Sequence, residues 1–245
     1  MYSKTTNNNV RLLLKRVYIE VDKRGENAVL AGKLKILTSD VKRERYKTSL
    51  SLVFDLSDNL KNSLNVKLLA PTIKFFESVG PDQIIYNKSL LHMTLFTFLS
   101  AESENSFDPK SDNIDKYESL SLRALHTLHP VRIKFSKVLL SENCIFLAGF
   151  PSGNGIVRIR DEIKKMLEME NLRYYKGPKN RIAHISFVRW GEQIPIEVRG
   201  NVLKFIKSLN KGSESTAAFD KVDLVLGNSY SDGPTRKIVR SIYLK

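Results

Sequence analysis

The chain has 245 residues, 42% of them hydrophobic, which is enough to bury a sizeable core and excludes a disordered polypeptide. No apolar run approaches the roughly 20 residues that a membrane-spanning helix needs, and residues 1–9 lack the hydrophobic stretch of a secretory signal, so we expect a cytoplasmic protein without a membrane segment. The formal charge of +14 favours polyanionic partners, nucleic acid first among them, over a merely lysine-rich solvated surface.

Cysteine use excludes two further classes of protein. Cys144 is the only cysteine, so the chain forms no intrachain disulfide and no cysteine-based metal cluster. It lies in the apolar run Cys-Ile-Phe-Leu-Ala-Gly, where a small thiol behaves as a hydrophobe. We therefore expect Cys144 to fill core space and not to act as a nucleophile.

The N-terminal 47 residues form an extension whose structure the pattern leaves open. Residues 10–21 fit either a helix or a strand, and residues 23–27, Lys-Arg-Gly-Glu-Asn, are typical of a turn. Beyond them, residues 48–245 have the pattern of one domain built of two lobes.

Within this domain, helices and strands are expected in an irregular order. Residues 48–56 alternate as in a strand, Ser57 is a helix N-cap, and helices are expected toward residue 66 and over residues 71–80. Further strands are expected at residues 83–87, 90–98, 131–140, 144–149, 182–189, 219–226 and 237–244, and further helices at residues 115–128, 156–170 and 196–209. Residues 103–115 and 210–215 are expected to be loops. The order is that of an α+β fold and lacks strict β-α-β alternation.

Two of the expected strands carry the same polar motif. One contains His92-Met93-Thr94 and the other His184-Ile185-Ser186. Because successive side chains of a strand alternate between faces, each motif projects an imidazole and a hydroxyl to one side. The motifs lie 92 residues apart, which suggests two lobes of similar design that share a cleft.

A pair of facing imidazoles suits hydrolysis or transesterification at a phosphodiester. One ring takes a proton from the attacking oxygen and the other supplies one to the leaving oxygen, and a histidine pKa of about 6.5 keeps both protonation states available. The hydroxyls are placed to hydrogen-bond the non-bridging phosphate oxygens. This scheme requires neither a metal ion nor a cofactor.

The motif pair resembles the twin His-x-Thr/Ser signature of the two-histidine phosphoesterase superfamily. That superfamily includes LigT-like RNA 2′,3′-cyclic phosphodiesterases, 2′,5′-oligoadenylate-cleaving phosphodiesterases and RNA 3′-end trimming exonucleases. The resemblance covers roughly residues 48–245 and implies a bilobal α+β fold, with two antiparallel sheets forming a central, metal-free cleft and helices on the outside. It implies His92 and His184 as the acid-base pair, and Thr94 and Ser186 as phosphate ligands.

Other side chains near the motifs are weaker candidates for substrate binding. Arg181 and Arg189 flank the second motif and suit phosphate, although both lie at odd offsets from His184 and would face the other side of a regular strand. Tyr86, Tyr174 and Tyr175 suit base stacking, with core or rim packing as the alternative.

The function expected from these residues is a metal-independent phosphodiesterase. It would act on RNA or oligonucleotides, opening 2′,3′-cyclic phosphates or cleaving 2′,5′ bonds, with no obligate protein partner and as a monomer. The alternatives are a 3′-end RNA exonuclease of the same superfamily, a non-catalytic RNA-binding module with the same basic cleft, or a structural protein with two buried histidines.

Overall fold

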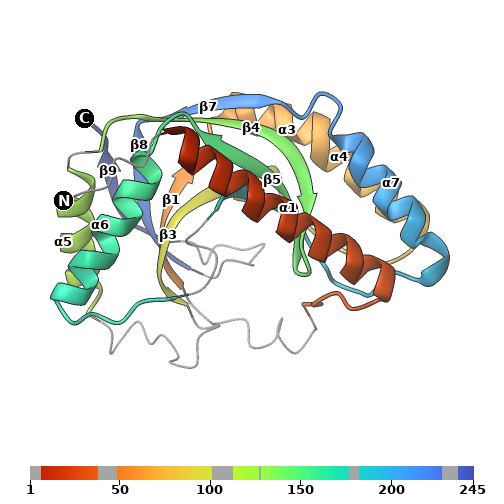
Figure 1. Ribbon diagram of the computed structural model, residues 1–245, viewed down its shortest axis with the longest axis horizontal. Coiled ribbons are helices and arrows are strands. Elements are labelled where there is room, and N and C mark those ends of the chain that lie inside the picture. Colours follow the sequence, from red (N-terminus) through yellow and green to blue (C-terminus); the bar gives the residue numbers. More distant parts are fainter. Residues whose placement is uncertain (1–6, 38–48, 101–112, 127, 177–181, 228–236) are drawn as a thin grey trace.

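Two antiparallel sheets with helices packed on them build the structure (Figure 1). The computed structural model describes residues 7–37, 49–100, 113–126, 128–176, 182–227 and 237–245, with side chains from residue 11 onward. The first sheet has the order β3-β1-β8-β9, with strands β1 (Ser49–Asp55), β3 (His92–Ser100), β8 (Lys221–Gly227) and β9 (Lys237–Tyr243). The second has the order β2-β6-β5-β4-β7, with strands β2 (Ile84–Ile85), β4 (Val131–Leu140), β5 (Cys144–Pro151), β6 (Ala183–Arg189) and β7 (Ser215–Phe219).

Alternation within the strands decides which face of each sheet the helices cover. In β1 the even-numbered residues Leu50, Leu52 and Phe54 are fully buried in the main core. Helices α5 (Ile114–Leu125) and α6 (Gly155–Met169) pack on the first sheet, and α6 contacts β3. This leaves the odd-numbered side chains of β1 for the opposite face.

The second sheet is covered in the same way by helices from two parts of the chain. The order there is α3 (Asp58–Leu64), η1 (Asn65–Leu69) and α4 (Ala70–Val79), followed later by η4 (Ile196–Val198) and α7 (Arg199–Leu209). Leu64, Leu68 and Leu69 lie against Ile185 and Phe187 of β6. Ile185 is the middle residue of the second motif, so its burial turns His184 and Ser186 toward the other face.

The secondary structure largely follows the expectation, and the α+β fold class is confirmed. Ser57 caps α3 by accepting a hydrogen bond from the Leu60 amide, as an N-cap serine should. The two helices expected before residue 80 are instead joined through the π-helical turn η1, which places Pro71 in the first turn of α4, where its missing N–H is tolerated. Strand β7 was not expected, and part of the expected loop 103–115 lies outside the described residues.

The turn expected at residues 23–27 is wrong, because these residues lie inside helix α1 (Asn7–Ala31). The reason is close packing at Gly25. A Cβ atom at this position would lie 2.5 Å from the backbone carbonyl carbon of Leu140, so only glycine lets the helix approach β4. The glycine that suggested a turn therefore serves a helix-to-sheet contact.

Helix α1 lies on the same face of the second sheet as the second motif. Leu14 and Tyr18 pack against Cys144, Phe146 and Ala148, the β5 residues on that face. Figure 1 shows α1 crossing in front of β4 and β5. Although α1 is 25 residues long, no helix in the described ranges is both long and apolar enough to cross a membrane.

The Tyr18 hydroxyl fastens α1 to the ends of two strands. It donates to the Gly149 carbonyl at 2.9 Å, lies within hydrogen-bonding reach of the Ala183 carbonyl, and accepts from the Ala183 amide at 3.2 Å. Gly149 and Ala183 are paired across β5 and β6, and Ala183 directly precedes His184. Burial raises the pKa of the Tyr18 phenol, so the group stays neutral in the folded protein.

We expect Tyr18→Phe to lower the free energy of unfolding by about 1–3 kcal/mol at pH 8, because it leaves buried backbone groups without a partner. The pKa of Tyr18 is raised in the folded state, so the parent loses stability as pH rises through the unfolded-state value of 10.0, whereas the variant lacks this loss. Urea unfolding at pH 8 and 10.5 should therefore show the difference between the two proteins shrinking. A difference that stays constant or grows would contradict the buried, neutral phenol.

Candidate active site

The two histidine motifs come together where the two sheets adjoin. Strand β3 is the edge of the first sheet, and it lies beside β6 of the second. Both motifs are regular in register, since His92 to Thr94 pair with Asp55 to Val53 of β1, and His184 to Ser186 pair with Ala148 to Phe146 of β5. Each imidazole therefore shares a face with its hydroxyl.

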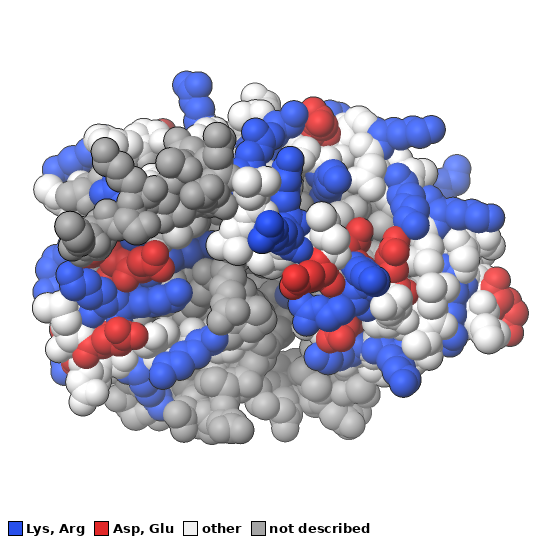
Figure 2. Space-filling view, viewed as in Figure 1, with Lys and Arg blue, Asp and Glu red and all other residues white. Residues whose placement is uncertain are grey.

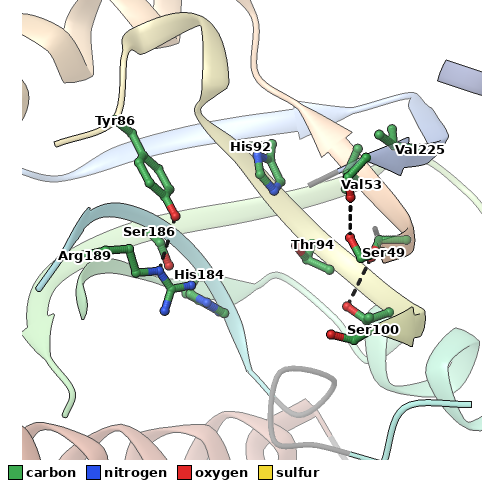
Figure 3. A pocket seen from close by; sticks show the side chains of 13 residues that line it. Ser49, Val53, Tyr86, His92, Thr94, Ser100, His184, Ser186, Arg189 and Val225 are labelled. Carbon is green, nitrogen blue, oxygen red and sulfur yellow. Dashed lines mark hydrogen bonds between the residues drawn. The ribbon is translucent and has the colours of Figure 1, made fainter. Parts of the chain in front are cut away.

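Burial within the motifs follows the same alternation. Met93 is 0% exposed and Ile185 is 1% exposed, whereas the two histidines, Thr94 and Ser186 are all half-buried. The middle residues anchor the strands in the core, so the polar residues face the space between the sheets. Figure 3 shows both imidazoles and both hydroxyls around this space.

One pocket holds both motifs. Its cavity volume is about 80 Å³, several times the ~10–15 Å³ that one water needs on the same measure. Its lining comprises Ser49, Ser51, Val53, Tyr86, His92, Thr94, Thr97, Ser100, His184, Ser186, Arg189, Val225 and Gly227. Four of these residues come from the two motifs, and a row of further hydroxyl residues comes from β1 and β3.

The ring of His92 is held in one tautomer. Its Nδ1 lies 2.7 Å from the Leu90 carbonyl oxygen. A carbonyl only accepts, so Nδ1 carries the proton and donates it, which leaves Nε2 as the lone-pair nitrogen of the neutral ring. Leu90 ends the short 3-10 helix η2 (Lys88–Leu90), which directly precedes β3.

The ring of His184 is held by aromatic packing. It stands edge-on to Phe146, with ring centroids 5.4 Å apart and planes at 75°, and its Nδ1 is buried. Phe146 in turn packs against Tyr18 of α1, so the helix and the strand together fix this side of the pocket. Cys144 is buried near Ser186.

Arg189 lines the pocket, contrary to the face expected for a regular strand. In the β5–β6 pairing, Phe146 faces Ser186 but Ile145 faces Val188, so Phe187 is an extra residue in a β-bulge. The bulge shifts the alternation by one residue and returns Arg189 to the face of Ser186. There its Nε donates to the Tyr86 hydroxyl at 3.2 Å.

The remaining candidates for substrate binding do not line this pocket or are not described. The Tyr174 hydroxyl donates to Glu168 at 3.0 Å. Burial, and to a smaller extent this hydrogen bond, raise the pKa of the phenol. Tyr175 is tied by its backbone amide to the Phe98 carbonyl at 2.6 Å. Arg181 lies outside the described residues.

Arg160 of α6 is a residue that sequence reasoning missed. It is 4% exposed, and its guanidinium donates to the carbonyls of Leu95 at 2.7 Å, Thr94 at 3.4 Å and Ile182 at 3.0 Å. The first two belong to β3, and Ile182 lies two residues before His184. Arg160 therefore ties the first histidine strand to the residue that directly precedes the second.

The environment of Arg160 explains why a buried charge is kept there. Leu95 is the extra residue of a bulge in β3, because Thr94 pairs with Val53 and Phe96 with Leu52. A bulged residue is left out of the ladder, and Arg160 supplies a donor to its carbonyl. Burial lowers the pKa of Arg160 to about 10, so it remains charged at neutral pH. The available signal was its position on the apolar stripe of α6 with Ile156, Ile163 and Leu167.

Within the residues that the structure describes, no group of three or more His, Cys, Asp or Glu side chains is arranged to hold a metal ion.

The fold is that of LigT and related structures. Comparison with solved structures matches TT0787 of Thermus thermophilus with a TM-score of 0.53 and 16% identity, over 80% of this chain and 97% of that one. Escherichia coli LigT in complex with 3′-AMP matches with a TM-score of 0.51 and 14% identity, over 81% and 98% of the two chains, and LigT in its apo form with 0.50 and 13%, over 81% and 97%. No protein-family model and no curated protein matches the sequence. The LigT-like fold that the motif pair implied is confirmed.

We expect Arg160→Met to lower the free energy of unfolding by about 1–3 kcal/mol, because buried carbonyls lose their donor while the packing volume is kept. Arg158→Met on the same helix is the matched control, since Arg158 is exposed, and should change it by less than about 0.5 kcal/mol. Denaturant unfolding measures both effects. Equal effects of the two substitutions would show that the hydrogen bonds of Arg160 do not stabilise the fold.

We expect neutral His92 to carry its proton on Nδ1, because that nitrogen faces a carbonyl. Long-range 1H–15N correlation spectra above the pKa of the ring distinguish the tautomers directly. A proton on Nε2 in the neutral ring would contradict the arrangement.

Proposed function

We propose that the protein is a metal-independent phosphodiesterase that acts on RNA or oligonucleotides by acid-base catalysis with His92 and His184. The observation that supports this most is that two half-buried imidazoles from different sheets line one pocket, each with a hydroxyl two residues further along its strand. In this proposal the two rings lie on either side of a bound phosphorus.

In the proposed reaction one ring acts as base and the other as acid. The base removes a proton from the attacking water, the new P–O bond forms, and the acid gives its proton to the ribose oxygen that leaves. In its neutral form His92 offers Nε2 as a proton acceptor because Nδ1 is engaged with Leu90. The orientation of the substrate decides which ring begins in which state.

Thr94 and Ser186 hold the phosphate in this proposal. Their hydroxyls donate to the two non-bridging oxygens and stabilise the charge that grows there in the transition state. Arg189 adds a positive charge at the end of the pocket where Tyr86 holds its Nε. All three contacts favour a phosphodiester over an uncharged ester.

The surface charge supports a nucleic-acid substrate. Figure 2 shows Lys and Arg side chains spread over the face that α1 crosses, with fewer Asp and Glu among them. The exposed basic residues of α1 are Arg11, Lys15, Arg16, Lys23 and Arg24. A positive field of this kind raises the local concentration of RNA. E. coli LigT, which has the same fold, crystallises with 3′-AMP, a nucleotide with a terminal phosphate.

The bonds proposed to be attacked are 2′,3′-cyclic phosphates and 2′,5′ linkages. In a cyclic phosphate the leaving 2′ or 3′ oxygen and the incoming water occupy opposite sides of the phosphorus, and each needs its own proton-transfer group. The two rings meet this need without further catalytic groups.

We expect His92→Ala and His184→Ala each to lower kcat by about 10²–10⁴-fold, because each removes one proton-transfer group. The assay incubates the protein with chelator and a panel of cyclic-phosphate, 2′,5′-linked and 3′,5′-linked oligonucleotides, and identifies the termini produced. His126→Ala is the matched control, since His126 is exposed at the end of α5 outside the pocket, and should leave the rate unchanged.

Parent-like turnover by both histidine variants would refute the acid-base assignment. Salt-dependent RNA binding by the parent without turnover of any substrate would show a binding module instead. Stepwise shortening of 3′,5′-linked RNA from its 3′ end would show an exonuclease.

A further inference from the structure

A row of hydroxyl side chains extends the pocket beyond the first motif. Ser49 and Ser51 come from β1, and Thr97 and Ser100 from β3, and all four line the pocket. They are at most 8% exposed, at positions where a sheet face packed in a closed core would carry apolar residues. The proposed chemistry uses none of them.

Two bulges in β3 bring Thr97 into this row. Leu95 and Phe98 are both extra residues, since Phe96 pairs with Leu52, Thr97 with Ser51 and Leu99 with Leu50. A regular strand would continue from Thr94 with Phe96 and Phe98 toward the pocket. Each bulge shifts the alternation by one residue, so Thr97 faces the pocket in their place.

The displaced phenylalanines confirm the change of face. Phe96 and Phe98 are both 0% exposed, pack against each other with ring centroids 5.2 Å apart, and Phe98 contacts Tyr117 of α5 at 5.5 Å. They belong to the core under the helices. The bulges thus allow β3 to place Thr97 in the pocket and both phenylalanines in the core.

Two hydrogen bonds determine what Ser49 and Ser51 offer to a ligand. Ser49 donates to the Gly227 carbonyl at 2.9 Å, and Ser51 donates to the Thr97 hydroxyl at 3.3 Å. A hydroxyl has one proton and two lone pairs, so Ser49 and Ser51 present acceptor lone pairs once their protons are engaged. These lone pairs can accept hydrogen bonds from O–H and N–H groups of a ligand. An ionised phosphate has no proton to donate and cannot bind to them in this way.

The two ends of the pocket therefore differ in charge. Figure 3 shows Arg189 and Tyr86 on one side of the histidine pair, and Ser49 and Ser100 on the other. Arg189 is the only Lys or Arg among the described residues that line the pocket. One end suits an anionic group, and the other suits a neutral group with several hydrogen-bond donors.

We infer that the hydroxyl row, Ser49, Ser51, Thr97 and Ser100, is a subsite for the nucleoside attached to the phosphate, and that it binds the ribose hydroxyls and base N–H groups. This inference rests on the proposed function for the position of the phosphate between the histidines. The substrate then lies with its anionic side toward Arg189 and its nucleoside along β1 and β3.

The experiment measures binding of two probes, inorganic phosphate and uridine 3′-monophosphate, by isothermal calorimetry. The variant is Ser51→Ala with Thr97→Val, which removes both members of one hydrogen bond. Ser121→Ala is the control, because this hydroxyl is 0% exposed in α5 and lies outside the pocket. Ser49→Ala alone repeats the test should the double variant fail to fold.

We expect the parent to bind the nucleotide more tightly than phosphate. The double variant should lose about tenfold in nucleotide affinity, as the loss of one or two hydrogen bonds implies, and should bind phosphate like the parent. Equal affinity of the parent for both probes, or an equal loss for both in the variant, would overturn the subsite and leave the proposed function intact. A parent that binds neither probe would overturn both.

Discussion

The pocket depends on one buried cation that joins two strands from different sheets. Arg160 donates to the carbonyl of the bulged residue Leu95 and, on the other side, to the carbonyl of Ile182. Without such a donor the bulge would leave a buried acceptor unsatisfied, and a regular β3 would turn phenylalanines into the pocket. The same contact sets β3 beside the start of β6. Arg160 thus supports both the polar lining and the approach of the two imidazoles.

Helix α1 also holds the backbone beside His184. Arg160 of α6 donates to the carbonyl of Ile182, and the Tyr18 hydroxyl of α1 accepts from the amide of the next residue, Ala183. The backbone that leads into His184 is therefore hydrogen-bonded to two helices. Helix α1 is therefore packed against the strands that carry His184 and Phe146, and its basic side chains are exposed. The pocket between these supports is asymmetric, with Arg189 at one end and hydroxyls at the other.

The regular parts of the site could be predicted from the sequence, and the irregular parts could not. Alternation places His92 with Thr94 and His184 with Ser186, because both motifs pair residue for residue with the neighbouring strand and contain no bulge. Beyond the motifs the same rule assigns Arg189 to the wrong face, since the extra residue Phe187 is specified by long-range pairing and not by local period. Arg160 reads as an ordinary helix arginine until its neighbours are known. Gly25 misleads for the same reason, because the strand that requires a glycine there is distant in sequence.

The most direct test of the account is a titration of the protein with inorganic phosphate, followed through the imidazole signals of its histidines by NMR. If one phosphate binds between the two rings, the signals of His92 and His184 should shift together and saturate with one shared Kd. Different Kd values for the two rings, or a response from only one of them, would contradict a single phosphate site between the sheets.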